Sequence, residues 1–155
     1  MNIFAKSGLI VTSGTLGKFP FLNLTQAVAV LRVTTALLFL AHAVVRIVKG
    51  TIPQFEVLMG SVGFPEPELV VWAITLCELV AGALLILNRY VRPAATILFT
   101  IAGVGIILIH RHFGWFVGEH GTGGSEYSVA LMVALLVVAS ADRETKVSCA
   151  SPPQN

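Results

Sequence analysis

A single carboxylate, Glu78, lies near the middle of the apolar run Leu69–Asn88. An acid at the centre of a membrane-length helix costs at least ~2.5 kcal/mol on insertion scales, so the fold must give it a partner, a water cavity or a function. A carboxyl group at this depth can exchange a proton or pair with a cation. Glu78 is therefore the first candidate for a ligand or proton site.

Polar side chains also recur in the earlier apolar run, Ala27–Val48, at the spacing of one helix face. This stripe contains Arg32, Thr35, His42 and Arg46, with Phe39 on the same face and Lys49 directly after the run. In lipid it is expected to face the bundle interior or water. The cations near the ends can instead reach the membrane surface through their long side chains. His42 lies deeper, and two interpretations stay open for it: a hydrogen-bonded structural residue or a residue of a site.

The candidate residues of a ligand or proton pocket are Glu78, His42, Arg46, His110 and Arg32. A quinone head requires a hydrogen-bond donor and an acceptor at a defined depth, and its reduction requires proton carriers. A buried carboxyl and an imidazole supply that chemistry. No residue is assigned a catalytic role from the sequence alone.

Haem and metal sites are not predicted. His42 lies about six residues below the outer end of its span and His110 almost at the end of its own, a depth mismatch of roughly 7–9 Å. Axial haem ligands need matched positions on facing helices. No C-x-x-C is present, and Cys and His do not cluster at zinc spacing. We expect no covalently bound cofactor.

Composition places the chain in a membrane. Of its 155 residues 55% are hydrophobic and only 12% charged, and the mean hydropathy is +0.86. A soluble domain carries roughly twice that charged fraction. The length allows about four spans of ~20 residues each. Nucleic-acid binding is not expected, because the basic residues are scattered and no aromatic-basic module occurs.

The apolar runs and turn signals predict an all-α fold, a four-helix transmembrane bundle with a short amphipathic helix in the first external loop. The predicted spans are about Leu24–Val48, Leu69–Asn88, Ala94–His110 and Glu126–Ala141. The short helix lies within Thr51–Gly63, with Pro53 in its first turn and a capping box formed by Thr51 and Gln54. It is expected to lie in the interface or to cover one end of the bundle.

Three regions follow from these boundaries: an N-terminal cytoplasmic or interfacial segment (1–23), the transmembrane domain (24–141) and a disordered cytoplasmic tail (142–155). Small residues mark positions where helices can approach closely. The predicted helix-packing positions are Gly82, Ala81, Gly103, Ala130 and Ala134.

Lysine and arginine predict the orientation. Seven of them fall on the side of the termini and of the turn between spans two and three, and three on the other. We therefore expect an integral protein of the cell (inner) membrane with both termini in the cytoplasm. His42, Arg46 and His110 are then expected in the outer half of the bilayer.

Five short motifs follow one another along the chain. The first comprises Arg32, Phe39-Leu40-Ala41-His42-Ala43 and Arg46, and the others are Gly63-Phe64-Pro65-Glu66-Pro67, Glu78-Leu79-Val80-Ala81-Gly82, Arg92-Pro93-Ala94-Ala95 and Gly123-Gly124-Ser125-Glu126-Tyr127. In order and spacing the chain resembles the DoxX family of small four-span membrane proteins, over about Arg32–Asp142. Ala43 and Arg46 stand where that family has glycine and lysine. The glycines of that family's C-terminal Gly-x-Gly and Ser-x-Asp end are absent here, where the sequence is Val138-Ala139-Ser140-Ala141-Asp142.

The resemblance implies a link to quinone-dependent oxidation of reduced sulfur compounds, or to membrane complexes that handle oxidative or thiol stress. The sequence has no nicotinamide, flavin or haem motif, so electrons would come from a partner, and an accessory subunit is expected rather than a stand-alone enzyme. The expected partners are the lipid bilayer and other membrane redox proteins; a homo-oligomer stays open.

Two alternatives are kept. In a non-catalytic assembly or scaffold factor, Glu78 would pair with Arg46 or Arg32 and fix the helix register. In a small-molecule or proton pathway, the intramembrane acid would line the route.

Overall fold

The computed structural model describes residues 21–108, 115–116 and 125–150, with side chains as far as Arg143. All the regular secondary structure in this part of the chain is helical, which confirms the predicted fold class. The helices are α1 (Leu24–Val48), α2 (Ile52–Val62), α3 (Pro67–Ile86), α4 (Val91–Leu108) and α5 (Ser125–Ala150). All except α2 are long and apolar enough to cross a membrane. The protein is therefore an integral membrane protein, with four candidate spans among the described residues.

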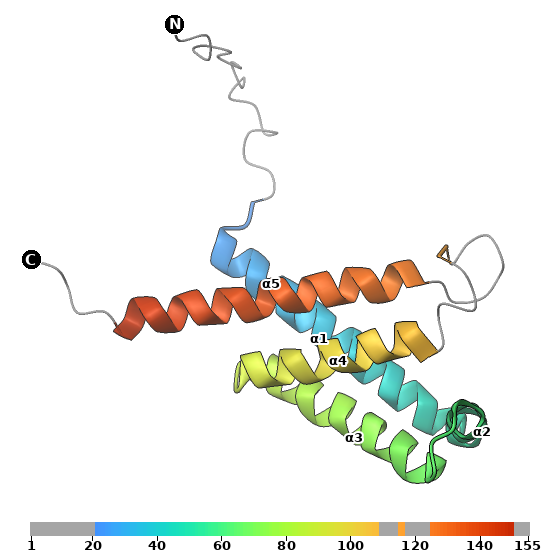
Figure 1. The fold of residues 1–155 in the computed structure, drawn as a ribbon. Coiled ribbons are helices and arrows are strands. Elements are labelled where there is room, and N and C mark those ends of the chain that lie inside the picture. The colour runs from blue at the N-terminus through green and yellow to red at the C-terminus, as the bar shows by residue number, and fades with distance from the viewer. Residues whose placement is uncertain (1–20, 109–114, 117–124, 151–155) are drawn as a thin grey trace, which may run out of the picture.

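The spans form two packed pairs. α1 lies along α3 and α4 lies along α5, while α2 covers the end of the bundle where α1 stops and α3 begins (Figure 1). α1 also contacts α5, and α3 also contacts α4, so the pairs close into one bundle.

The first span begins at a capping box. The Asn23 side chain accepts a hydrogen bond from the Gln26 backbone N–H (2.9 Å), and the Gln26 side chain accepts one from the Asn23 N–H (3.0 Å). Both bonds satisfy donors that a helix start leaves unpaired.

The short helix α2 has the predicted position, with Pro53 in its first turn and Gly63, at φ 102°, after its last residue. The predicted capping box is wrong. Thr51 adopts ψ 6° rather than the extended backbone that side-chain capping requires. Its hydroxyl donates instead to the Arg46 carbonyl (3.4 Å), because only a short turn separates it from the end of α1.

The turn between α3 and α4 is tight. Asn88 (φ 55°) and Tyr90 (φ 49°) both lie in the left-handed region. α4 begins at Val91, so Pro93 falls within its first turn, where a missing N–H costs no hydrogen bond.

The last helix is longer than predicted, which corrects the boundary of the tail. α5 continues through Ala150, although a disordered tail was predicted from residue 142. Residues 142–150 contain no glycine or proline, and several are good helix formers, so nothing in this polar stretch ends the helix.

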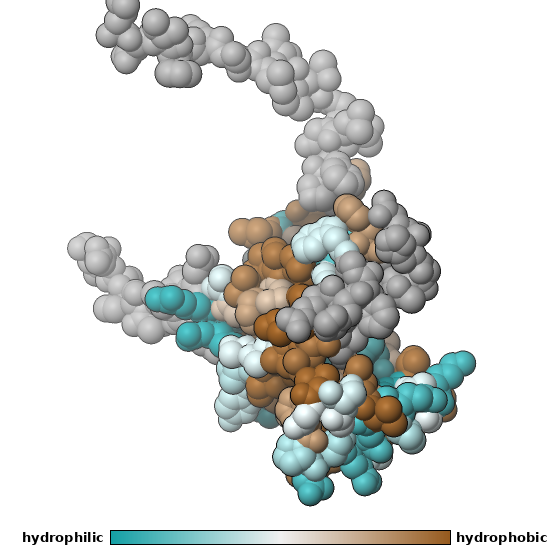
Figure 2. Space-filling view, turned by 45° about the vertical axis from the view of Figure 1, so that its right-hand side comes forward, coloured by the Kyte–Doolittle hydropathy of each residue, from teal (hydrophilic) through white to brown (hydrophobic). Residues whose placement is uncertain are grey.

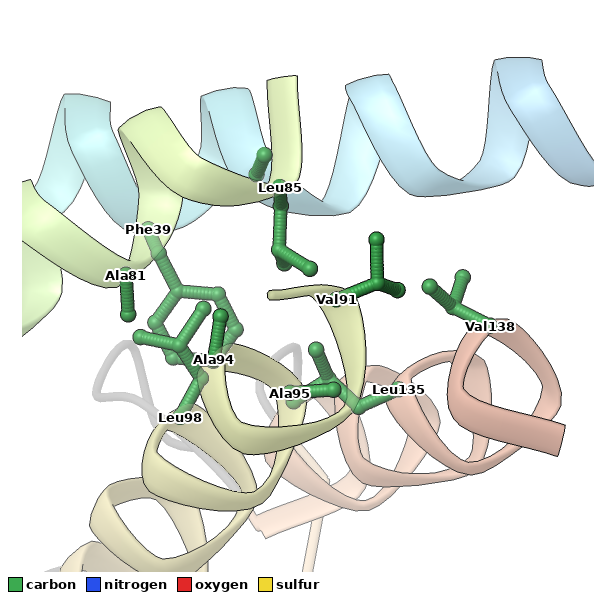
Figure 3. Packing of buried hydrophobic residues seen from close by; sticks show 10 residues of the cluster. Phe39, Ala81, Leu85, Val91, Ala94, Ala95, Leu98, Leu135 and Val138 are labelled. Atoms are coloured by element: carbon green, nitrogen blue, oxygen red, sulfur yellow. The ribbon is translucent and has the colours of Figure 1, made fainter. Parts of the chain in front are cut away.

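The main core lies where α1, α3, α4 and α5 meet and is built largely from small and medium side chains. Figure 3 shows Phe39, Ala81, Leu85, Val91, Ala94, Ala95, Leu98, Leu135 and Val138 of this cluster. A second cluster, Ile52, Met59 and Val71, joins α2 to α3. Large apolar side chains are exposed along all four spans and gather over the middle of the face in Figure 2. They are the surface that meets lipid.

The predicted helix-packing positions differ in their surroundings. Ala81 is buried, and Gly82 lies directly against Leu40 of α1. Gly103 faces Met132 of α5. Ala134 is half-buried, but Ala130 is exposed. The buried stripe of α5 runs instead through Ser128, Leu135 and Val138. At 100° per residue, Ala130 falls on the far side of the helix.

Candidate functional site

A buried ion pair joins α1 to α3. Arg46 Nη1 lies 2.9 Å from Glu78 Oε2, and the two side chains are only 8% and 4% exposed. The same Nη1 donates to Thr75 Oγ1 (2.7 Å), one turn before Glu78, and the Thr75 hydroxyl donates to the Val71 carbonyl (2.8 Å). Breaking a buried pair by removing one partner costs about 3–5 kcal/mol. The pair therefore constrains how α1 and α3 are aligned.

The aromatic ring of Phe55 brings α2 to this pair. The Arg46 guanidinium carbon lies 5.0 Å from the ring centroid, within the range of a cation–π contact. Thr51 also bonds the Arg46 carbonyl. Arg46 thus contacts residues from α3, from α2 and from the turn that precedes α2.

A cavity of about 520 Å³ lies beside the ion pair and is lined by residues from all five helices. Most of its wall is apolar. The polar lining residues are His42, Arg46, Glu78, Thr100, Tyr127 and Ser128. Pockets of roughly 300–1,000 Å³ with mostly apolar walls and a few polar groups are typical of small-molecule sites.

The structure brings together three of the five predicted pocket residues. Glu78, His42 and Arg46 all line the cavity. Arg32 does not. It lies 14 residues before Arg46 on α1, roughly 21 Å along the axis, and its Nη1 donates to Asn88 Oδ1 at the other end of the bundle. His110 lies outside the described residues.

Sequence reasoning did not assign to the site several residues that line the cavity or bond the ion pair, among them Thr75, Phe55, Thr100, Tyr127 and Ser128. For Thr75 a signal existed, since a hydroxyl three residues before a buried acid shares its helix face. Tyr127 and Ser128 carried no comparable signal, because α5 reaches the cavity only through the closure of the bundle.

The polar residues that line the cavity can form hydrogen bonds and exchange protons. Arg46 is a donor, Glu78 an acceptor when ionised, and His42 can do either. Among the described residues no group of three His, Cys, Asp or Glu side chains is placed to hold a metal ion. The arrangement suits a ligand with a compact polar head and an apolar body.

In the comparison with known families, the DoxX family model matches residues 27–111. The matched stretch contains Arg46, Glu78, Thr75 and Phe55, whereas α5 lies outside it. No curated protein and no solved structure matches the chain.

Proposed function

The chain belongs to the DoxX family, whose model covers more than half of its length, and from this premise we propose that it is an accessory subunit of a quinone-linked membrane redox system. The observation that carries the proposal is the cavity of about 520 Å³ with the Arg46–Glu78 pair in its wall. The cavity lies between spans, so a lipophilic molecule could enter from the bilayer.

The lining residues fit a quinone-type ligand in three respects. The apolar walls from α1, α3 and α4 suit its ring and tail. Arg46 is a donor for a carbonyl oxygen, and Glu78 is an acceptor for a ring hydroxyl. A quinone carries two electrons together with two protons, and His42 and Glu78 are the residues of this wall that exchange protons. The electrons would come from a partner protein.

Quinone binding can be tested directly. A short-tailed benzoquinone is titrated into the purified protein, and binding is followed by tryptophan fluorescence. Glu78→Gln keeps the shape of the side chain and an oxygen that can accept from Arg46, but it removes the charge. We expect about tenfold weaker quinone binding, a larger loss than the loss of protein from the membrane. Glu68→Gln, which removes an exposed carboxylate at the start of α3, is the control and should bind like wild type. A wild-type protein that binds no quinone would refute the proposal.

A second function, an assembly or scaffold factor, is favoured by a different feature of the same pair. The charge of Arg46 is already matched by Glu78, and Thr75 accepts a further bond, so the network can lock α1 to α3 without a ligand. Buried ion pairs that fix register are a recognised structural device.

A double variant separates the two functions. Arg46→Met alone should destabilise the protein by about 3–5 kcal/mol, because Glu78 is left buried without its cation. Arg46→Met combined with Glu78→Leu should recover most of that loss, since no charge remains. A scaffold would then keep its assembly role in the double variant. A quinone site would lose binding although the fold is stable.

A further inference from the structure

A second, open cavity of about 670 Å³ lies at the turn between α3 and α4. It is lined by Arg89, Tyr90, Arg92, Pro93 and Thr96. It shares no lining residue with the cavity beside the ion pair, and the proposed quinone chemistry makes no use of it. Its lining contains two arginines and no acid.

The charges at this cavity are not neutralised within the described part of the chain. Arg89 and Arg92 are both exposed, and neither has a described carboxylate within 4.0 Å. The first turn of α4 contains no acidic residue, so the positive end of its helix dipole adds to the arginines. The cavity is therefore a place where an anion is stabilised.

The residue types point to a phosphate group. Guanidinium groups bind phosphate oxygens through paired, charge-assisted hydrogen bonds, which a lysine cannot reproduce. The hydroxyl of Tyr90, whose side chain is 72% exposed, adds a neutral donor of the kind found at the level of lipid headgroups.

The position of the turn selects a lipid rather than a free phosphate. The turn joins two spans and so lies at the membrane surface, at the depth of phospholipid headgroups. From Arg92 the exposed face of α4 continues through Thr96 to Ile97 and Ile107, which are 43% and 58% exposed. These apolar side chains form a surface along which acyl chains can lie. Headgroup and chains are thus accommodated by one helix face.

We propose that this basic cavity binds the headgroup phosphate of an anionic phospholipid, with the acyl chains along the exposed face of α4. The predicted orientation puts it in the cytoplasmic leaflet, where anionic lipids attract basic side chains close to a membrane span.

Native mass spectrometry of the detergent-solubilised full chain tests the proposal. Dioleoyl phosphatidylglycerol, dioleoyl phosphatidylcholine and inorganic phosphate are titrated separately. We expect one phosphatidylglycerol to bind in preference to phosphatidylcholine, and inorganic phosphate at equal concentration not to displace it. Arg89→Gln combined with Arg92→Gln should weaken phosphatidylglycerol binding about thirtyfold, because the double variant removes two positive charges at the level of the lipid headgroups.

Arg143→Gln is the matched control, because it removes an exposed cation at the same end of the bundle, outside the cavity. It should leave the affinity within twofold. An equal loss of phosphatidylglycerol affinity in Arg143→Gln would mean that surface charge in general attracts the lipid, and it would overturn the proposal. Equal binding of phosphatidylcholine and phosphatidylglycerol, or displacement of phosphatidylglycerol by inorganic phosphate, would overturn it as well. If the double variant does not fold, the single variants Arg89→Gln and Arg92→Gln should each bind about fivefold more weakly.

Discussion

At the scale of single residues, Arg46 is the point where the contacts of the site converge. It pairs with Glu78, bonds Thr75 and lies over the ring of Phe55. A planar guanidinium can pair and stack at once, which the point charge of a lysine cannot do. The arginine found here in place of the family's lysine therefore makes contacts to two neighbouring helices that a lysine would make less well.

Gly82 is the residue whose replacement should disturb helix packing most clearly. A Cβ at this position would lie 2.8 Å from Leu40 Cγ and 3.4 Å from the Ala36 carbonyl oxygen. Gly82→Ala should therefore push α3 away from α1 and lower the free energy of unfolding by about 1–3 kcal/mol. Thermal unfolding in detergent measures the effect.

Gly103→Ala is the control for this substitution. The added Cβ would meet the end of the flexible Met132 side chain, whose methyl group lies at an ordinary contact distance of 3.5 Å. Since alanine is the better helix former by about 1 kcal/mol, this variant should be as stable as wild type or more so. If both variants lose stability equally, the close approach of α1 and α3 does not explain why glycine is needed at position 82.

At the scale of elements, α2 is a lid fixed at defined points. Met59 and Ile52 pack with Val71 of α3, and Phe55 covers Arg46. Phe55 and Met59 also line the cavity, so this helix forms one of its walls. A shift of α2 would expose the ion pair.

Replacing the ring of Phe55 should loosen this lid. Phe55→Leu keeps an apolar side chain but removes a cation–π contact worth about 0.5–2 kcal/mol. We expect amide hydrogen exchange across Ile52–Val62 to become at least about threefold faster, while the core of α4 is unchanged. Val57→Ala, at a position that is 75% exposed on the same helix, should leave exchange unaltered. Equal exchange in Phe55→Leu and wild type would show that Arg46 does not hold α2.

At the scale of the whole molecule, helices that cross the membrane put the two ends of the bundle on its opposite sides. α2 lies at one end, and the α3–α4 turn lies at the other (Figure 1). The distribution of lysine and arginine predicts that the α2 end faces outward.

Single-cysteine labelling tests this orientation. In a background with Cys77→Ala and Cys149→Ala, Ser61→Cys on α2 and Tyr90→Cys in the α3–α4 turn each place one thiol at an exposed position. A membrane-impermeant maleimide applied to intact cells should label the first and spare the second, and lysed cells should label both. The reverse pattern would invert the predicted topology.

The sequence alone determined the architecture. Long apolar runs, prolines and glycines are local signals, and lipid requires each span to satisfy its own backbone, so four spans and the short helix α2 were predictable. Charge and helical periodicity also identified Glu78 as a residue that needs a partner, a water cavity or a function. They predicted that the stripe with Arg46 faces the interior or water, with the membrane surface as the alternative for Arg46. The end of α5 was not predictable in this way. A polar segment without glycine or proline can either continue the preceding helix or adopt an irregular conformation.

Only the tertiary structure decided which cation meets Glu78. Arg32 and Arg46 are 14 residues apart and share one face of α1, so periodicity cannot choose between them. The packing of α1 against α3 at Gly82 sets the register, and that register brings Arg46 to Glu78 and Arg32 to Asn88. The cavity has the same origin. Its wall combines side chains from five helices, and no single helix contains the information that places them together.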